Sequence, residues 1–150
     1  MALLMSARTN YEITWLIRRV FRGMARVAGD ALEPLGISAA ERAVMEFLFP
    51  DEALSVPEIA SRYDVSRQHV QVTVNTLVAK HLVERRPNPR HKRSGLICLS
   101  ARGKRLFEEV RAQDAKLIEQ LFADLPAAHL STTLKTLKAL NLRLEKGPSK

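Results

Sequence analysis

The segment from Ser55 to Ser100 constrains the fold more than any other part of the chain. Ser55 and Glu58 match a capping box, and Pro57 follows within the first turn, so a short helix begins after Ser55. A polar break ends that helix, and Ser66 can cap a second helix that lasts until about Lys80. The sequence therefore predicts two short helices joined by a tight turn between Ser55 and Lys80.

Each residue of an α-helix is rotated by about 100° from the one before it, and on this basis the second helix has two unlike faces. One face is apolar, with Val70, Val74, Leu77 and Val78; the other is mostly uncharged and polar, with Gln68, Val72 and Asn75 flanked by Gln71 and Thr76. Gln and Asn amides can pair bidentately with adenine, and a Val methyl group can touch the methyl group of thymine. The helix taken alone is equally compatible with an ordinary surface helix.

A basic β-hairpin is predicted after this helix. His81 stands where a left-handed residue commonly ends a helix, and the runs Leu82–Arg85 and Leu96–Leu99 have strand character. Five of the nine residues from 85 to 93 are Lys or Arg, and none is acidic. Long cations on such a wing can reach the minor groove and phosphates while the helix occupies the major groove. The alternative is a merely solvated loop.

The candidate DNA contacts follow from this arrangement. They are Ser55, Ser66, Arg67, Gln68, Gln71, Val72, Asn75, Arg85, Arg90, Lys92 and Arg93.

Three segments together resemble the MarR family of winged-helix transcriptional regulators. They are LGISAAERAVMEFL, LVAKHLVER and NPRHKRSGLICLSARGKRL, and the resemblance extends over nearly the whole chain. It implies a mainly α fold with a small β-hairpin wing, in a single unit of residues 1–150. Residues 38–100 would form the winged helix-turn-helix lobe, and residues 1–37 and 101–150 the helical dimerisation region.

The resemblance also implies roles for individual residues. A homodimer would read a pseudo-palindromic operator and act as a repressor. Gln68, Gln71 and Val72 would stand at base-reading positions, and Arg90, Lys92 and Arg93 on the wing. Family members often have Thr-Arg where this chain has Gln71-Val72, and Asp where it has His91. The first departure implies a different preferred operator, and the second a looser clamp on the wing arginine.

The terminal regions favour dimerisation. A long amphipathic helix is expected from about Thr9 to Leu32, and Ser38 with Glu41 makes a second capping box for a helix that ends before Pro50. A further helix begins near Ala101. After Pro126, a stripe like a coiled-coil seam runs through Leu130, Leu134, Leu137, Asn141 and Leu144. Such faces could be covered within one chain, but terminal helices this apolar more often meet a twofold mate.

The resemblance implies a small aromatic or phenolic effector in a crevice between the dimer helices and the winged lobes. Tyr11 and Trp15 lie one turn apart and could line that crevice, while Arg18 or Arg19 could pair with a carboxylate. Trp15 could equally be a dimer-core or surface-anchoring residue.

Charge supports a polyanionic partner. The chain carries a formal charge of +8, and residues 55–100 hold eight bases against three acids, whereas residues 1–54 hold six against seven. Nucleic acid and an acidic membrane surface both fit. No apolar run reaches the roughly 20 residues that span a bilayer, so we expect a cytoplasmic protein with no membrane partner. An architectural protein that coats DNA with little sequence preference is the main alternative.

Little points to an enzyme or a cofactor. The glycines are scattered, the histidines His69, His81, His91 and His129 show no metal-binding spacing, and no nucleophile elbow is present. We therefore expect no metal, no cofactor and no catalytic residue. The single cysteine, Cys98, lies in an apolar strand, where a buried thiol is favoured over a redox sensor. The hydroperoxide-sensing branch of the family carries its cysteine near the N-terminus, where this chain has none.

Overall fold

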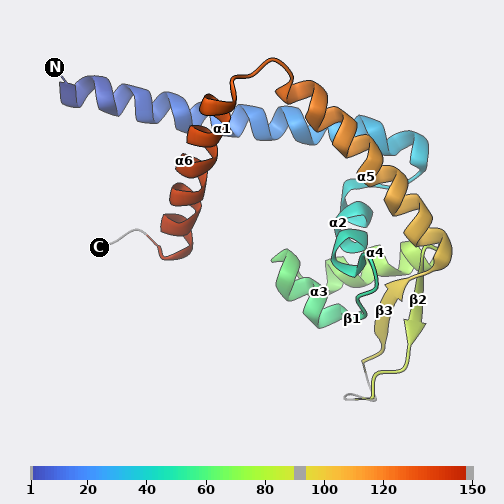
Figure 1. Cartoon of the computed structure of the whole chain (residues 1–150). Coiled ribbons are helices and arrows are strands. Elements are labelled where there is room, and N and C mark those ends of the chain that lie inside the picture. The colour runs from blue at the N-terminus through green and yellow to red at the C-terminus, as the bar shows by residue number, and fades with distance from the viewer. Residues whose placement is uncertain (1, 90–93, 148–150) are drawn as a thin grey trace. The chain divides into compact units, whose positions relative to one another are not determined.

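The computed structural model describes residues 2–89 and 94–147 and divides into two compact units, residues 1–114 and 115–150 (Figure 1). Its elements, in chain order, are α1 (Ala2–Leu32), the 3-10 helix η1 (Glu33–Leu35), α2 (Ala39–Leu48), β1 (Leu54–Ser55), α3 (Val56–Tyr63), α4 (Arg67–Ala79), β2 (Val83–Arg86), β3 (Leu96–Leu99), α5 (Ala101–Phe122) and α6 (Ala127–Glu145). The expected mainly helical fold with a small β-hairpin is confirmed.

Helices α2, α3 and α4 pack together beside the sheet and form what we call the lobe. Its core is built from the apolar faces of these helices, from strand residues and from the first half of α5. The fully buried side chains are Val44, Met45, Leu48, Ile59, Val70, Val74, Leu77, Leu82, Ile97, Phe107 and Val110. The apolar face predicted for the second helix of the pair therefore faces this core, with Val78 half-buried at its edge.

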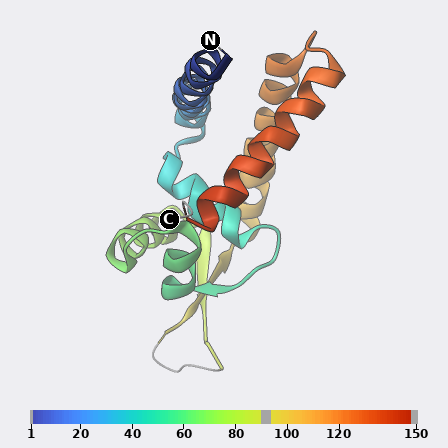
Figure 2. The same cartoon turned by 90° about the vertical axis from the view of Figure 1, so that its left-hand side faces the viewer.

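The sheet has three antiparallel strands in the order β1-β3-β2. β2 and β3 pair from Val83 with Leu99 to Arg86 with Leu96, and this hairpin extends beyond the helices of the lobe (Figure 2). β3 spans the predicted residues, whereas β2 begins one residue later than expected, because the amide of Leu82 still donates to Leu77 O, 2.9 Å away, at the end of α4.

Two local expectations change in the structure. The strand β1 was not predicted; it is only two residues long and pairs Leu54 with Ile97. Helix α1 begins at Ala2 rather than near Thr9. The added residues include Ala, Leu and Met, which have high helix propensity and extend the helix toward its N-terminus.

The helix starts follow the predicted caps. At Ser38, the hydroxyl accepts from Glu41 N at 3.2 Å while Glu41 Oε2 accepts from Ser38 N at 2.7 Å. Ser66 Oγ accepts from His69 N at 3.1 Å and opens α4. His81 has φ of 58°, so the left-handed end of α4 is also as predicted.

The end of α4 and the start of α5 are joined by a compact junction. Ser100 Oγ donates to His81 O at 2.8 Å and accepts from Gly103 N at 2.9 Å. Ser100 N donates to Leu82 O at 3.0 Å. Gly103 packs so closely that a Cβ there would lie 1.9 Å from Leu82 O. Only glycine lets α5 begin this near to the backbone of Leu82.

We expect Gly103→Ala to lower the free energy of unfolding by about 2 kcal/mol or more, because overpacking forces the backbone apart and exceeds the gain in helix propensity. Gly29→Ala is the matched control, since a Cβ at Gly29 in α1 meets nothing within 4 Å. Urea denaturation of the two variants measures the difference. Equal stability of both variants would show that the junction tolerates a wider separation.

Candidate nucleic-acid interface

The outer face of α4 is the surface that the sequence assigns to base recognition. Gln68, Val72 and Asn75 are exposed, and Gln71 is half-buried beside them. Val72 is 61% exposed on the side of α4 that faces away from the core. The structure thus presents three amides and one methyl-bearing side chain together on one face of the helix.

A hollow of about 380 Å³ lies where the start of α3, the outer face of α4 and the hairpin meet. It brings together four of the candidate residues, three from α4 and one, Arg85, from β2. The lining residues are Val56, Pro57, Arg67, Gln68, Gln71, Arg85, Ser94, Gly95 and Ile97. Two guanidinium groups therefore flank amides within one concave surface, which is a suitable environment for a phosphate and a neighbouring base edge.

Asn75 connects the outer face of α4 to strand β2. Its Oδ1 accepts from Gln71 Nε2 at 2.9 Å and from Arg85 Nη2 at 2.9 Å. The Gln71–Asn75 bond has the i, i+4 spacing that brings side chains together on a helix, a signal that the sequence contains. The bond to Arg85 depends on the packing of β2 against α4, so the residues next to Asn75 in the sequence do not predict it.

The two serines cap helices. Ser55 is 7% exposed, and both its amide and its hydroxyl donate to Glu58 Oε2, at 2.8 and 2.6 Å. Ser66 is exposed, but its hydroxyl holds the first turn of α4 as described above. The structure therefore uses both hydroxyl groups to start the helices that carry the candidate contacts. Arg90, Lys92, Arg93 and the neighbouring His91 lie outside the described residues.

An ion pair between a buried carboxylate and a partly exposed ammonium, which the sequence did not reveal, supports α4 from the opposite side. Glu41 is 4% exposed. Its Oε1 accepts from Lys80 Nζ at 2.6 Å, and the same ammonium donates to Gly36 O at 2.8 Å. Burial of Glu41 disfavours its charged form, but the hydrogen bonds from Lys80 and Ser38 outweigh burial, so the pKa of this carboxyl lies below its ordinary value. The pair fixes the end of α4 to the start of α2.

The candidate effector residues lie along one face of α1. Tyr11, Trp15 and Arg18 line a hollow of about 380 Å³ together with Ala7, Asn10 and Thr14. Tyr11 is 76% exposed and Trp15 is 44% exposed. The guanidinium carbon of Arg19 lies 4.7 Å from the centroid of the Trp15 ring, in cation–π geometry. Arg19 is thereby held by the indole, and Arg18 is the cation that lines the hollow.

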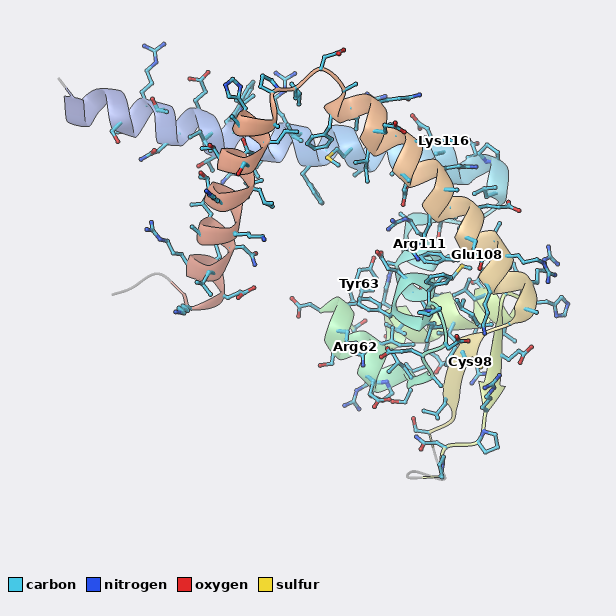
Figure 3. All side chains as sticks on the ribbon, viewed as in Figure 1. Arg62, Tyr63, Cys98, Glu108, Arg111 and Lys116 are labelled. Carbon is cyan, nitrogen blue, oxygen red and sulfur yellow. The ribbon has the colours of Figure 1, made fainter. Side chains whose placement is uncertain are left out.

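Cys98 lies on β3 among the side chains of the lobe, as Figure 3 shows, and is 4% exposed. Its thiol lies 3.9 Å from Glu84 O on the neighbouring strand. Within residues 2–89 and 94–147, no three or more His, Cys, Asp or Glu side chains are placed to hold a metal ion. Over the same ranges, no helix has the length and apolar character needed to cross a membrane.

A family model and the matching solved structures agree on one family. A model of the MarR family matches residues 35–94. An uncharacterised protein of Mycobacterium tuberculosis is 30% identical over 136 residues, which are 89% of this chain and 95% of that protein. A crystal structure of a MarR-family transcription regulator aligns with a TM-score of 0.88 at 21% identity, covering 94% of this chain and 93% of that one.

A second structural match includes DNA. A mutant of MarR from E. coli, crystallised in complex with operator DNA, is 27% identical with a TM-score of 0.75. The match covers 86% of this chain and 93% of that one. The fold is therefore shared over most of the chain.

The Glu41–Lys80 pair predicts a pH-dependent loss of stability in Lys80→Met. Because the pKa of Glu41 is lowered by folding, its contribution is complete above the unfolded-state pKa of about 4.3 and is lost as pH falls through the lower folded-state pKa. We expect the free energy of unfolding at pH 7 to be about 1.5 to 3 kcal/mol lower for Lys80→Met than for wild type, since Glu41 stays buried without its charged donor.

That deficit should shrink as pH falls and Glu41 becomes protonated, which urea denaturation between pH 7 and pH 3 measures. Lys104→Met is the matched control, because Lys104 pairs with the exposed Asp51 and such pairs contribute at most about 1 kcal/mol. An equal deficit in both variants, or one that does not change with pH, would contradict the assignment.

Proposed function

Because this chain belongs to the MarR family, a family of transcription regulators rather than enzymes, we propose that it binds a pseudo-palindromic operator as a homodimer and represses transcription. The observation that carries this proposal is the exposed, uncharged polar face of α4 flanked by Arg67 and Arg85. Operator binding also implies a cytoplasmic location.

The outer face of α4 has the chemistry that major-groove recognition requires. Gln68 and Gln71 offer amides to base edges, and the exposed Val72 offers methyl groups to thymine. Arg67 at the start of α4 and Arg85 on β2 line the same hollow and would contact phosphates there. Arg90, Lys92 and Arg93 would add contacts from the wing. The E. coli relative bound to operator DNA supports this assignment for the lobe as a whole.

We expect Arg67→Ala to weaken binding to both specific and mixed-sequence duplexes and to reduce the slope of log affinity against log salt by about 1. Arg143→Ala removes the same charge from the last turn of α6 and serves as the control. Fluorescence anisotropy with a labelled duplex at several salt concentrations measures both slopes. If the two variants bind alike, Arg67 makes no phosphate contact.

The homodimer is supported by apolar side chains on the terminal helices. On α1, Val20 is 56% exposed and Phe21 is 71% exposed. On α6, Leu134 is 53% exposed and Leu137 is 42% exposed, and the described part of this helix contains no buried residue. A leucine stripe on a helix with no buried residue gains its stabilisation by packing against a second chain. Twofold pairing would place the two α4 helices about 10 base pairs apart on an inverted repeat.

We expect the double variant Leu134→Glu/Leu137→Glu to sediment as a monomer at micromolar concentration and to lose operator affinity. The control is Thr132→Glu/Ala139→Glu, which adds the same two charges to the opposite side of α6 and should remain a dimer. Analytical ultracentrifugation distinguishes the two. Unchanged dimerisation of the leucine variant would exclude the α6 stripe from the interface.

We further propose that a small aromatic or phenolic acid releases the protein from DNA by binding at Tyr11, Trp15 and Arg18. Its carboxylate would pair with Arg18 and its ring would lie against the exposed aromatic side chains. Control requires that the ligand bind the DNA-incompetent state more tightly, and a tenfold preference shifts the balance by about 1.4 kcal/mol. Trp15 is the single tryptophan, so saturable quenching by benzoate that Arg18→Ala abolishes is expected. Absence of quenching would exclude this site for benzoate.

A further inference from the structure

We propose that Asn75 reads a keto base, guanine or thymine, and that Arg85 and Gln71 fix this preference by holding the carboxamide of Asn75 in one orientation. The proposal rests on the proposed function, because it concerns the same DNA-reading face. It makes Asn75 a specificity-determining residue and Arg85 a positioning residue that acts through it.

The orientation of the Asn75 amide follows from the chemistry of its neighbours. A guanidinium group carries only donors, so the atom of Asn75 that faces Arg85 Nη2 at 2.9 Å must be the carbonyl oxygen. The atom of Gln71 that meets this same oxygen at 2.9 Å must then be its amide nitrogen. One cation on β2 thus determines the direction of two amides on α4.

Both lone pairs of Asn75 Oδ1 are used by these bonds, since a carbonyl oxygen has two. The amide nitrogen Nδ2, with its two hydrogens, is left for DNA on the exposed face of α4. Asn75 therefore offers donors to a base edge and has no acceptor left to offer.

This result changes the expectation for Asn75 that its residue type alone suggests. Bidentate pairing with adenine requires the side-chain oxygen to accept from N6 while the nitrogen donates to N7. The oxygen of Asn75 is already engaged, and the N6 amino group of adenine or the N4 amino group of cytosine would place a donor against a donor. Adenine keeps one acceptor, N7, beside that amino group, whereas guanine O6 and N7 or thymine O4 offer Nδ2 an acceptor with no donor next to it on the same base.

Gln71 and Asn75 are consequently not equivalent, although both are carboxamides on one helix face. Gln71 gives one hydrogen of Nε2 to Asn75 and keeps Oε1 and its second hydrogen, so it can still accept as well as donate. Asn75 can only donate. The pair therefore presents a fixed, ordered pattern of donors and acceptors rather than two amides that each turn to suit any base.

The substitution Asn75→Asp tests the proposal with almost no change of shape. A carboxylate still accepts from Gln71 and Arg85, but it presents an oxygen to DNA in place of Nδ2. We expect selection from randomised duplexes to show, at one symmetric pair of positions, a change from a keto base to an amino base, cytosine above all, because carboxylates accept from cytosine N4. Relative affinity for the two operators should invert by roughly tenfold or more.

A second pair of variants tests the role of Arg85 independently of how Asn75→Asp folds. Arg85→Met removes the donor that fixes Asn75, while Arg86→Met removes the same charge from the next residue of β2, where no bond to Asn75 exists. Both variants should lose affinity through charge. Only Arg85→Met should let adenine compete with the keto base at the position where Asn75→Asp acts.

The outcomes separate this proposal from the proposed function. If wild type enriches an operator but Arg85→Met and Arg86→Met retain the same base preference at every position, the orientation of Asn75 does not determine specificity and the proposal is overturned. The same conclusion follows if Asn75→Asp enriches the wild-type operator. If wild type enriches no sequence at all, the proposed function itself is wrong.

Discussion

The close contact between Gly103 and the carbonyl of Leu82 is the constraint on which the lobe depends. It lets α5 begin directly against the chain that leaves α4, and Ser100 joins the two by bonding both His81 O and Gly103 N. The Lys80–Glu41 pair fixes the same end of α4 to α2. Because these contacts determine where α4 ends, they also determine where its outer face lies relative to the hairpin that follows.

The proposed recognition surface depends on that placement. Strand β2 leaves the junction and returns Arg85 to the outer face of α4, where it bonds Asn75. At the other end, Ser66 caps α4 and positions Arg67 and Gln68 beside the same hollow. The bonds of Ser100 and Lys80 at the end of α4 therefore support the bonds that Asn75 makes on the outer face of the same helix. A site held in this way would need little rearrangement to bind DNA as proposed.

Much of this organisation is predictable because it is encoded locally. The caps at Ser38 and Ser66, the left-handed His81, the apolar face of α4 and strand β3 all follow from neighbouring residues or from helical spacing. What the sequence does not reveal is set by contacts between distant segments. Strand β1 is too short to show a strand pattern in the sequence. The sequence identifies Glu41 only as a capping residue, and its bond to Lys80 depends on how α4 packs against α2. The orientation of Asn75 requires Arg85, which lies ten residues away. The same folding buries Ser55, a candidate contact, and uses its hydroxyl within the lobe.

Selection of randomised duplexes by the purified full-length protein at physiological salt tests the central claim most directly. Sequencing of the recovered pool should show an inverted repeat with half-site centres about 10 base pairs apart. Titrations should then show about a thousandfold preference for that repeat over scrambled DNA. Uniform recovery with steeply salt-dependent binding would contradict the account. It would mean that the basic charge of the chain binds DNA without any recognition of bases by the outer face of α4.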